Sequence, residues 1–461
     1  MNTSMEDNTA TPRGLQYTSG DIPRAVARLA LPAIGENLLT TMVFIVDTLL
    51  IGWLRDPAAL AAVSLGGMFL NIANQLFAGI AVAATTLVAH AWGAGERERA
   101  RRIAAQAIVV GVLFAVLAIL VLWPAAGPLL SLMGASERAT SLGIQYVRII
   151  LVTSLLGFPM IVLNGILRGS GDTQTPMTVT LIMNVWNVLA AGALTFGVGP
   201  LPPLGLAGAA WGTASARLLG GVVALYIVMS GKRFLRIHWS DLLRLDRTLI
   251  GQMVRLSLPI AGESIVTRSG FVLFMRIVSG LGEAPLAAHQ IAVNVESLSY
   301  MPGFGLSVAS TTLVGQSLGA RRPDLAEKSI RTSMRFALVV MGMVGGIFAL
   351  FGPSLASLFG STPEVVALAG SAIRIGAVEQ LPIAVQMVLS GGLRGAGDTR
   401  TPMYATLLGT LLFRVPVVYF FAVYLGLGLD GVWWGTALDW TARAVVLYLL
   451  FRRGAWRRIR L

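Results

Sequence analysis

Long apolar stretches separated by short polar breaks follow one another along almost the whole chain. A helix that crosses the hydrocarbon core of a bilayer needs about 20 residues. Twelve stretches reach that length, and the predicted helices begin near residues 31, 63, 103, 144, 176, 204, 253, 285, 333, 371, 402 and 429. The pattern therefore predicts an all-α integral membrane protein with twelve transmembrane helices.

The composition agrees with a chain whose solvent is the bilayer. Of the 461 residues, 55% are hydrophobic and 12% are charged, whereas soluble domains carry roughly 25% charged residues. Cysteine is absent, which excludes disulfide bonds, thiolate metal ligands and cysteine nucleophiles. The formal net charge of +13 does not indicate nucleic-acid binding, because the basic residues interrupt apolar stretches instead of gathering on a soluble face.

Lysine and arginine residues are distributed unevenly between alternate loops. One set of loops, together with both termini, holds nearly all of the basic loop residues, and the other set holds Arg55 and Arg138. Positively charged short loops stay in the cytoplasm. Both termini are therefore predicted to be cytoplasmic, with the protein in the inner (plasma) membrane. The basic residues at the C-terminus are expected to contact anionic membrane lipid: Arg452, Arg453, Arg457, Arg458 and Arg460.

Two motifs occur twice in the chain. LRGSGDTQTPM at 167–177 returns as LRGAGDTRTPM at 393–403, and LVAHAWGA at 87–94 returns at the same spacing as LVGQSLGA at 313–320. Because this spacing covers an even number of predicted helices, the two halves share one orientation. The repeat predicts two homologous six-helix lobes related by a pseudo-two-fold axis along the membrane normal.

A basic segment without a long apolar stretch separates the two halves. The predicted organisation is a cytoplasmic N-terminal tail at 1–21, an N-lobe at 22–230, a cytoplasmic linker at 231–252, a C-lobe at 253–451 and a basic cytoplasmic tail at 452–461. Two such lobes place a central cavity between them, and alternating access would rock one lobe against the other. This arrangement favours a transporter over an enzyme.

The repeated Gly-Asp-Thr segments are predicted to be tight turns. Asp172 and Asp398 would accept hydrogen bonds from nearby backbone amides, and Pro176 and Pro402 would lie in the first turns of the helices that follow. A role as a cytoplasmic gate or a substrate contact is the alternative.

Together these segments resemble the multidrug and toxic compound extrusion (MATE) transporters. The first helix contains LPAIGENLLTTMVFIVDTLLIG, the second ends in LVAHAWGAGERERARR, LRGxGDTxTP is doubled, and AAHQIAVNVESLSYMPGFGLSVASTTLVGQSLGA covers the eighth helix. The resemblance extends from about residue 22 to 451. It implies export of cationic or amphiphilic small organic compounds by a membrane antiporter that is coupled to H+ or Na+ and needs no cofactor. A monomer is expected.

The resemblance also implies a cation-coupling site in the N-lobe. Asp47 matches the acidic residue of the family's first helix, Asn187 matches its fifth-helix asparagine, and Thr213 matches a threonine of the sixth helix. Where the family often has a second acid, this chain has Ala191. If the coupling ion is Na+, Asp47 and Asn187 are the expected ligands; no other metal site is predicted.

Buried charge gives a physical reason to single out Asp47. A charged side chain at the centre of a spanning helix costs roughly 3 kcal/mol or more, so it must face protein or water. Glu36 lies three helical turns before Asp47 on nearly the same face, so both could line one pathway. LPAIGE at 31–36 returns as LPIAGE at 258–263, so Glu263 is the repeat mate of Glu36. The alternative is therefore that Glu36 tethers the end of its helix. Asn184 shares a helical face with Asn187 and is a further candidate.

The C-lobe departs from the family pattern. The acids that one branch of the family has in helices seven and ten fall near Thr267 and Ile383. We expect a secondary polar network made of Glu263, Glu296, Glu379 and Arg268, with Arg276 and Arg414 as further basic partners. Mutual neutralisation in buried ion pairs is one interpretation, and proton relay or cation binding is the other.

Two further functions compete with coupled efflux. A lipid-linked saccharide flippase shares the two-lobed architecture, but it would favour a cationic cavity and additional helices. An intramembrane enzyme needs a clustered nucleophile and base or a metal site, and the three dispersed histidines at positions 90, 238 and 289 provide neither. The Gly-rich turns lack the Lys-Ser/Thr of a phosphate-binding loop, so ATP is not expected to be the energy source.

Overall fold

A computed structural model describes residues 20–134, 136–198, 202–231, 236–459 and 461. Most of the predicted N-terminal tail, part of the linker and Arg460 lie outside these residues. Among the described residues, secondary structure is entirely helical. The first half contains α1 (Ile22–Trp53), α2 (Pro57–Gly93), α3 (Arg97–Leu132), α4 (Glu137–Ser170), α5 (Gln174–Phe196) and α6 (Leu206–Ser230).

The second half begins with a short helix in the predicted linker and continues with the remaining long helices. In order they are α7 (Trp239–Leu243), α8 (Arg247–Ser279), α9 (Glu283–Ser297), α10 (Tyr300–Gly319), α11 (Pro323–Ser357), α12 (Pro363–Gly395), α13 (Arg400–Leu407), η1 (Leu408–Arg414), α14 (Val415–Tyr419), η2 (Phe420–Tyr424), α15 (Gly428–Arg453) and η3 (Ala455–Arg458). The segments from α13 to η2 form one continuous span in which η1 and η2 are π-helical.

Ten helical segments of the described chain are long and apolar enough to cross a membrane. Two further segments complete the twelve that the sequence predicts. One is the pair α9 and α10, which is interrupted only at Leu298 and Ser299. The other is α15, whose hydropathy is lowered by the buried charges of Asp439 and Arg443. The all-α, twelve-helix fold class is therefore confirmed.

Several helices begin earlier than their apolar stretches. α1 begins at Ile22 and α11 at Pro323, about ten residues before the predicted starts, because polar first turns extend beyond the apolar stretch. At other starts a side chain caps the helix: Asp246 accepts from the amide of Thr248 ahead of α8, and Thr362 accepts from Val365 ahead of α12. Such caps satisfy amides that have no partner inside the helix.

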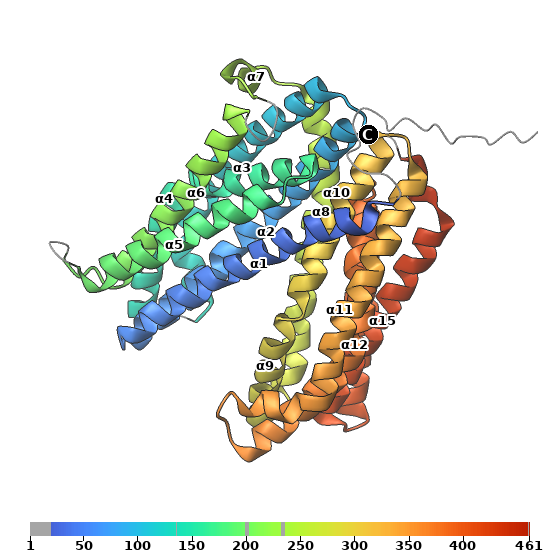
Figure 1. Ribbon diagram of the computed structural model, residues 1–461. Helices are drawn as coiled ribbons and strands as arrows, with labels where there is room; N and C mark the ends of the chain where they lie inside the picture. Colours follow the sequence, from blue (N-terminus) through green and yellow to red (C-terminus); the bar gives the residue numbers. More distant parts are fainter. Residues whose placement is uncertain (1–19, 135, 199–201, 232–235, 460) are drawn as a thin grey trace, which may run out of the picture.

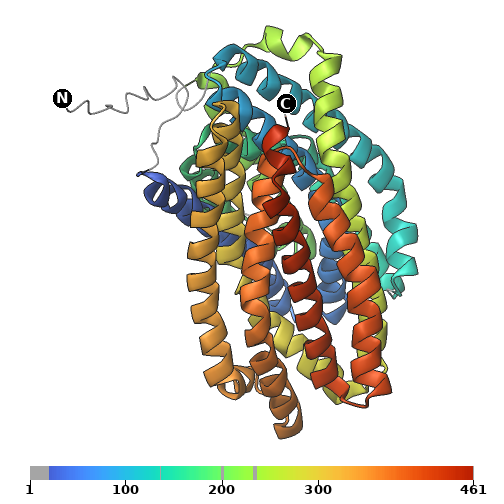
Figure 2. The same ribbon diagram turned by 90° about the vertical axis from the view of Figure 1, so that its right-hand side faces the viewer.

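The helices form two arms that meet at one end and separate at the other (Figure 1). The N-lobe comprises α1–α6 and the C-lobe comprises α8–α15. Corresponding helices pack in corresponding pairs: α3 and α6 pack on α4, and α11 and α15 pack on α12. In Figure 2 the orange and red helices α11, α12 and α15 run along the length of the C-lobe. The packing reproduces the symmetry of the sequence repeat.

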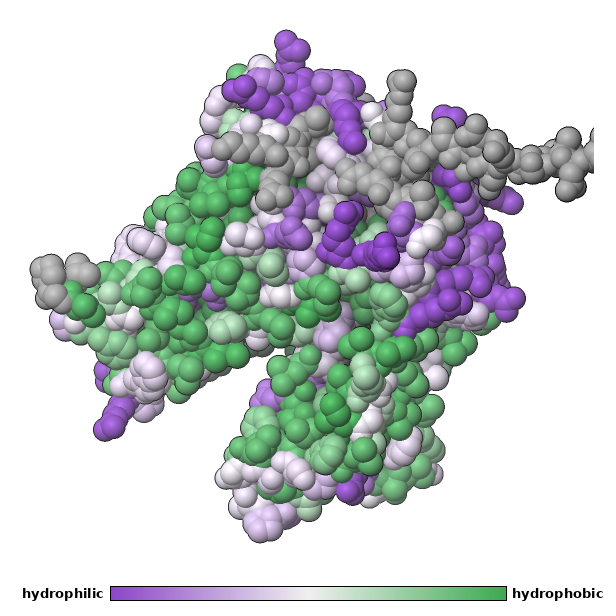
Figure 3. All heavy atoms as spheres, in the orientation of Figure 1, coloured by the Kyte–Doolittle hydropathy of each residue, from purple (hydrophilic) through white to green (hydrophobic). Residues whose placement is uncertain are grey.

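The space-filling surface shows an open notch between the two arms (Figure 3). In this view apolar residues cover most of both arms, and hydrophilic residues gather at the end where the arms meet. We call the joined end, where the C-terminus also lies, the closed end, and the opposite end the open end.

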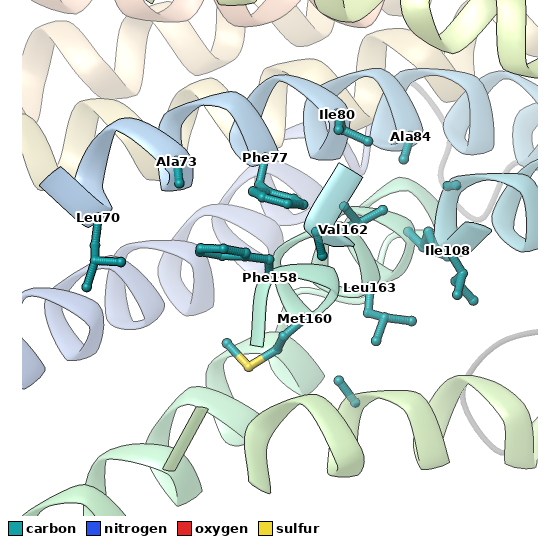
Figure 4. Packing of buried hydrophobic residues seen from close by; sticks show 14 of the residues in the cluster. Leu70, Ala73, Phe77, Ile80, Ala84, Ile108, Phe158, Met160, Val162 and Leu163 are labelled. Atoms are coloured by element: carbon teal, nitrogen blue, oxygen red, sulfur yellow. The ribbon is translucent and has the colours of Figure 1, made fainter. Parts of the chain in front are cut away.

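Aromatic stacking marks the core of the N-lobe. Phe77 on α2 stacks on Phe158 on α4 with 4.5 Å between ring centroids and 18° between ring planes, and Val162 and Leu163 continue the contact (Figure 4). Small residues such as Ala84 lie between the large ones. In membranes, small residues let helices approach closely, and van der Waals packing then holds them. This core holds α2 and α4 together in the N-lobe.

Candidate functional site

The structure brings together Asp47 on α1, Asn187 on α5 and Thr213 on α6. The Thr213 hydroxyl donates to Asp47 Oδ2 at 2.7 Å, and Asn187 Nδ2 donates to Asp47 Oδ1 at 3.3 Å. Asn187 Nδ2 also lies 3.0 Å from Thr213 Oγ1. All three side chains are buried, with at most 4% of their surface exposed. The three helices therefore enclose one polar cluster, which we call the Asp47 cluster.

The atoms of the Asp47 cluster suit a cation or a proton. Asn187 Oδ1 is buried and has no hydrogen-bond partner among the described residues, so one acceptor remains free beside the carboxylate. Carboxylate, amide and hydroxyl oxygens are the ligands that hard cations prefer. A protonated carboxyl needs an acceptor for its O–H, which the same amide oxygen can provide. No group of three or more His, Cys, Asp or Glu residues with metal-site geometry occurs in the described part of the chain.

Asn184 and Glu36 do not join the Asp47 cluster. Asn184 Nδ2 donates to the backbone oxygen of Thr180 on its own helix at 2.9 Å. Glu36 is buried and accepts two hydrogen bonds from Arg168 on α4, at 2.5 and 3.2 Å, and one from Asn164 Nδ2 at 3.1 Å. Sharing a helical face with a site residue did not bring either side chain into the site.

Glu263 repeats the environment of Glu36 in the C-lobe. It accepts hydrogen bonds from Arg394 Nη2 at 2.7 Å and from Thr406 Oγ1 at 3.0 Å. Arg168 and Arg394 are the arginines of the two LRGxGDT segments. In each lobe the first helix is therefore tied to the fourth helix by an equivalent ion pair, which matches the tethering interpretation of the two glutamates.

Arg268, a member of the expected C-lobe network, donates a hydrogen bond outside that network. Arg268 Nη2 donates to Asn71 Oδ1 on α2 at 2.5 Å. Arg268 follows Glu263 by five residues on α8, and five residues turn a helix by about 500°, which points the two side chains apart. Arg276 is exposed and also lies outside the network.

A second buried polar cluster occupies the centre of the C-lobe. The carboxyl groups of Glu296 on α9 and Glu379 on α12 lie against each other, with the Tyr300 hydroxyl beside Glu296. Glu379 accepts from Thr436 Oγ1 on α15 at 2.5 Å. Glu296 Oε1 is buried without a hydrogen-bond partner in the described chain. Two adjacent buried carboxyl groups favour a shared proton, because two like charges in a dry site repel each other strongly.

An ion-pair triad that the sequence did not reveal lies beside this carboxyl pair. Asp439 accepts from Arg414 at 2.7 Å and from Arg443 at 2.5 and 2.7 Å, and Arg443 also donates to Thr410 at 3.0 Å. Arg414 reaches Asp439 from the π-helical turn η1, and such turns are frequent at functional sites. The four-residue spacing of Asp439 and Arg443 is the signal that could have found the pair.

Comparison with known proteins agrees with this architecture. The MatE family model matches residues 32–191 and 259–420. A probable multidrug resistance protein NorM of Thermotoga maritima is 31% identical over 445 residues, covering 95% of this chain and 94% of that protein. The multidrug resistance protein PmpM of Pseudomonas aeruginosa is 31% identical over 450 residues, covering 94% of this chain and 91% of that protein.

Solved structures give the same result. A crystal structure of MATE in the bent conformation superposes with a TM-score of 0.89 at 25% identity and covers 96% of this chain and 98% of its own. The outward-facing structure of a multidrug resistance MATE family transporter of the MOP superfamily has a TM-score of 0.89 at 25% identity and covers 98% of this chain and all of its own.

Fold and site thus define a two-lobed, multi-pass membrane transporter. The chain belongs to the MATE family of efflux transporters. It is a transporter and not an enzyme.

Proposed function

We propose that the protein is a secondary antiporter that exports small amphiphilic or cationic organic compounds in exchange for H+ or Na+ by alternating access. The buried carboxylate of the Asp47 cluster is the observation that supports this function best. A buried carboxylate tolerates neutralisation by a proton or by Na+, so the occupancy of this site can favour one conformation over the other. The names of the relatives support multidrug efflux as the activity.

The distribution of basic residues supports an orientation for this antiporter. Hydrophilic residues gather at the closed end (Figure 3). Exposed arginines lie near the start of α3, after α7, before α11, and at the end of α15 and beyond it: Arg102, Arg244, Arg321, Arg452 and Arg458. By the preference of positive loops for the cytoplasm, we place the closed end and both termini in the cytoplasm and the open end outside the plasma membrane. Within this orientation we retain 22–230 and 253–451 as the two lobes, with 231–252 as the linker and cytoplasmic tails at 1–21 and 452–461.

In the proposed cycle, Asp47 is the main coupling residue, and Asn187 and Thr213 position its carboxylate. If a proton binds Asp47, the O–H group that forms would donate a hydrogen bond to a neighbouring oxygen such as Asn187 Oδ1. If Na+ binds instead, its ligands would be the oxygens of all three side chains. Glu36 and Glu263 are proposed to hold the first helix of each lobe, and Asn184 remains a candidate on the face of α5. Both lobes and the notch come from one chain, so we propose a monomer as the functional unit.

We further propose that Glu296 and Glu379 form a second exchangeable site. Their side-by-side carboxyl groups and the unpartnered Glu296 Oε1 support it. The Asp439 triad balances the charge: Arg414 and Arg443 contribute two positive charges against the three carboxylates. One carboxyl group must therefore be neutralised by a proton or a cation if the buried cluster is to be uncharged overall.

Purified protein in proteoliposomes tests the function. Efflux of a fluorescent organic cation is followed under an imposed proton gradient and, separately, under an imposed sodium gradient. Transport driven by one of the two gradients establishes antiport and identifies the ion. No transport under either gradient would contradict coupled efflux of organic cations, and would favour the lipid-linked saccharide flippase.

A further inference from the structure

The two motifs that are repeated in the sequence meet each other across the closed end. The Thr86 hydroxyl on α2 donates to the backbone oxygen of Arg394 on α12 at 3.0 Å, and its repeat mate Thr312 on α10 donates to the backbone oxygen of Arg168 on α4 at 3.0 Å. Each bond joins one lobe to the other. Thr86 and Thr312 are fully buried, so water does not compete for these bonds.

A second pair of bonds has the same symmetry. His90 Nε2 donates to the Gly395 oxygen at 2.9 Å, and Gln316 Nε2 donates to the Gly169 oxygen at 3.0 Å. His90 and Gln316 occupy the same position in the LVAHAWGA and LVGQSLGA segments. Backbone carbonyls in the last turns of α4 and α12 thus accept hydrogen bonds from the opposite lobe. The Arg168 and Arg394 oxygens also accept from the amides of Gly171 and Gly397 in their own lobes, whereas carbonyls of a last turn such as those of Gly169 and Gly395 have no partner within the helix ladder.

Two glycines let the lobes approach closely enough for these bonds. A Cβ atom on Gly93 of α2 would lie 1.9 Å from the Gln316 oxygen, and a Cβ atom on Gly319 of α10 would lie 2.0 Å from the His90 oxygen. Both obstacles are backbone atoms of the opposite lobe, so no side-chain rotation relieves them. Any residue other than glycine at these positions must separate α2 from α10.

We infer that these six residues form a two-fold latch whose strength sets the balance between the two access states of the transporter: Gly93 and Gly319 with Thr86, His90, Thr312 and Gln316. The inference rests on the proposed alternating access, since opening of the closed end breaks all four bonds at once. The latch is also connected to α1, one of the helices of the Asp47 cluster. The backbone oxygen of Arg168 accepts the bond from Thr312. The side chain of Arg168 donates to Glu36 on α1, the helix that contains Asp47.

Distances between spin labels on the two lobes test the latch. The chain contains no cysteine, so Glu98→Cys and Asp324→Cys introduce the sole labelling sites. Both side chains are exposed, at 64% and 58%, in the first turns of α3 and α11 that follow α2 and α10. Pulsed dipolar spectroscopy in lipid nanodiscs then reports the separation of the lobes at the closed end without substrate or coupling ion.

The expected result is a shift towards longer distances when the latch is weakened. Loss of one hydrogen bond changes an equilibrium by about two- to tenfold, so Thr86→Ala with Thr312→Ala should raise the ratio of open to closed populations by roughly tenfold or more. Gly93→Ala and Gly319→Ala should each give a comparable shift, because the two positions are equivalent by symmetry.

Matched controls separate the latch from general effects on packing. Thr85 and Thr311, the adjacent residues, donate within their own lobes to Gly165 and Gly391 at 2.8 and 2.9 Å. Thr85→Ala with Thr311→Ala should leave the distances unchanged. Gly346→Ala, at a helical position with open space around it, controls for the intrinsic effect of alanine.

Two outcomes would overturn the inference. One is an unchanged distance distribution in the Thr86/Thr312 variant and in whichever glycine variants fold; the other is an equal shift in the Thr85/Thr311 control. The distance measurement does not depend on transport. If weakening the latch lengthens the distances in a protein that transports no organic cation, the latch is supported and only the proposed function is contradicted.

Discussion

Replacing Asp47 by asparagine should abolish ion-coupled export and leave the protein folded. The substitution preserves the shape of the side chain and removes its charge. Thr213 can still donate to the new amide oxygen. Asn187 can turn its amide so that its Oδ1, unpartnered in the structure, accepts from the new NH2 group. Both hydrogen bonds to residue 47 thus keep an equivalent, and the bond from Asn187 Nδ2 to Thr213 Oγ1 is lost, so the expected loss of stability is about 1 kcal/mol.

The loss of coupling should be much larger than the loss of stability. An ionised side chain in the middle of the membrane costs roughly 3 kcal/mol relative to a neutral one. Neutralisation of Asp47 can therefore shift the equilibrium between access states by a factor of about one hundred, since each 1.4 kcal/mol corresponds to tenfold. The asparagine of the Asp47→Asn variant stays neutral and cannot change its charge, so gradient-driven efflux should fall by a factor of about one hundred.

The assay is efflux of a fluorescent organic cation from proteoliposomes under the gradient that drives the wild type. Asp56→Asn is the matched control: Asp56 caps α2 through the amides of Ala58 and Ala59, and asparagine caps helices as well as aspartate does. The control should retain transport. Full gradient-driven efflux by a folded Asp47→Asn variant would refute the assignment of Asp47 as the coupling residue.

The remaining predictions concern the ion pairs. Glu36→Gln should destabilise the protein by about 2 kcal/mol, less than the loss of a fully buried pair because 22% of the Arg168 side chain is exposed; a melting midpoint equal to that of the wild type would contradict this. Glu263→Gln should lower the midpoint less, since Arg394 makes a single hydrogen bond to Glu263. Asp439→Asn should be the most damaging, by about 3–5 kcal/mol, because it removes the carboxylate that is hydrogen-bonded to both arginines of a buried triad; normal yield and melting would show that the triad is not needed for stability.

Under the proposed antiport, these variants should differ in transport as well as in stability. If Glu36 only tethers α1, Glu36→Gln should retain ion-coupled efflux in proportion to the amount of folded protein, whereas Asp47→Asn should not. A loss of coupling in folded Glu36→Gln would show that the glutamate belongs to the ion pathway and is more than a tether.

Much of the architecture was predictable because it depends on local pattern. The length and apolarity of each stretch determined the helices, since only a helix satisfies its own backbone polar groups in lipid. The repeated segments determined that two similar lobes exist. The Glu36 and Glu263 environments agree because the two residues occur in repeated sequence. Asp47 was identifiable because a charged side chain in an apolar spanning helix is costly and must face protein or water.

The partners of the charged residues were decided by tertiary structure. Arg394, far away in the chain, and not Arg268 on the same helix, neutralises Glu263. Helical periodicity specifies the face of a side chain, but which other helix lies against that face depends on how the lobes pack. For the same reason Glu36 and Asn184 share a face with site residues and yet bond elsewhere.

The sequence by itself determined the helices, the two-fold repeat and the acid at position 47, because each of these follows from residues close together in the chain or from identical segments. Tertiary structure alone decided that the two repeated motifs contact each other, with Thr86 bonded to Arg394 and Thr312 bonded to Arg168. These contacts join the two lobes. They follow from the relative position of two lobes, which no local pattern specifies.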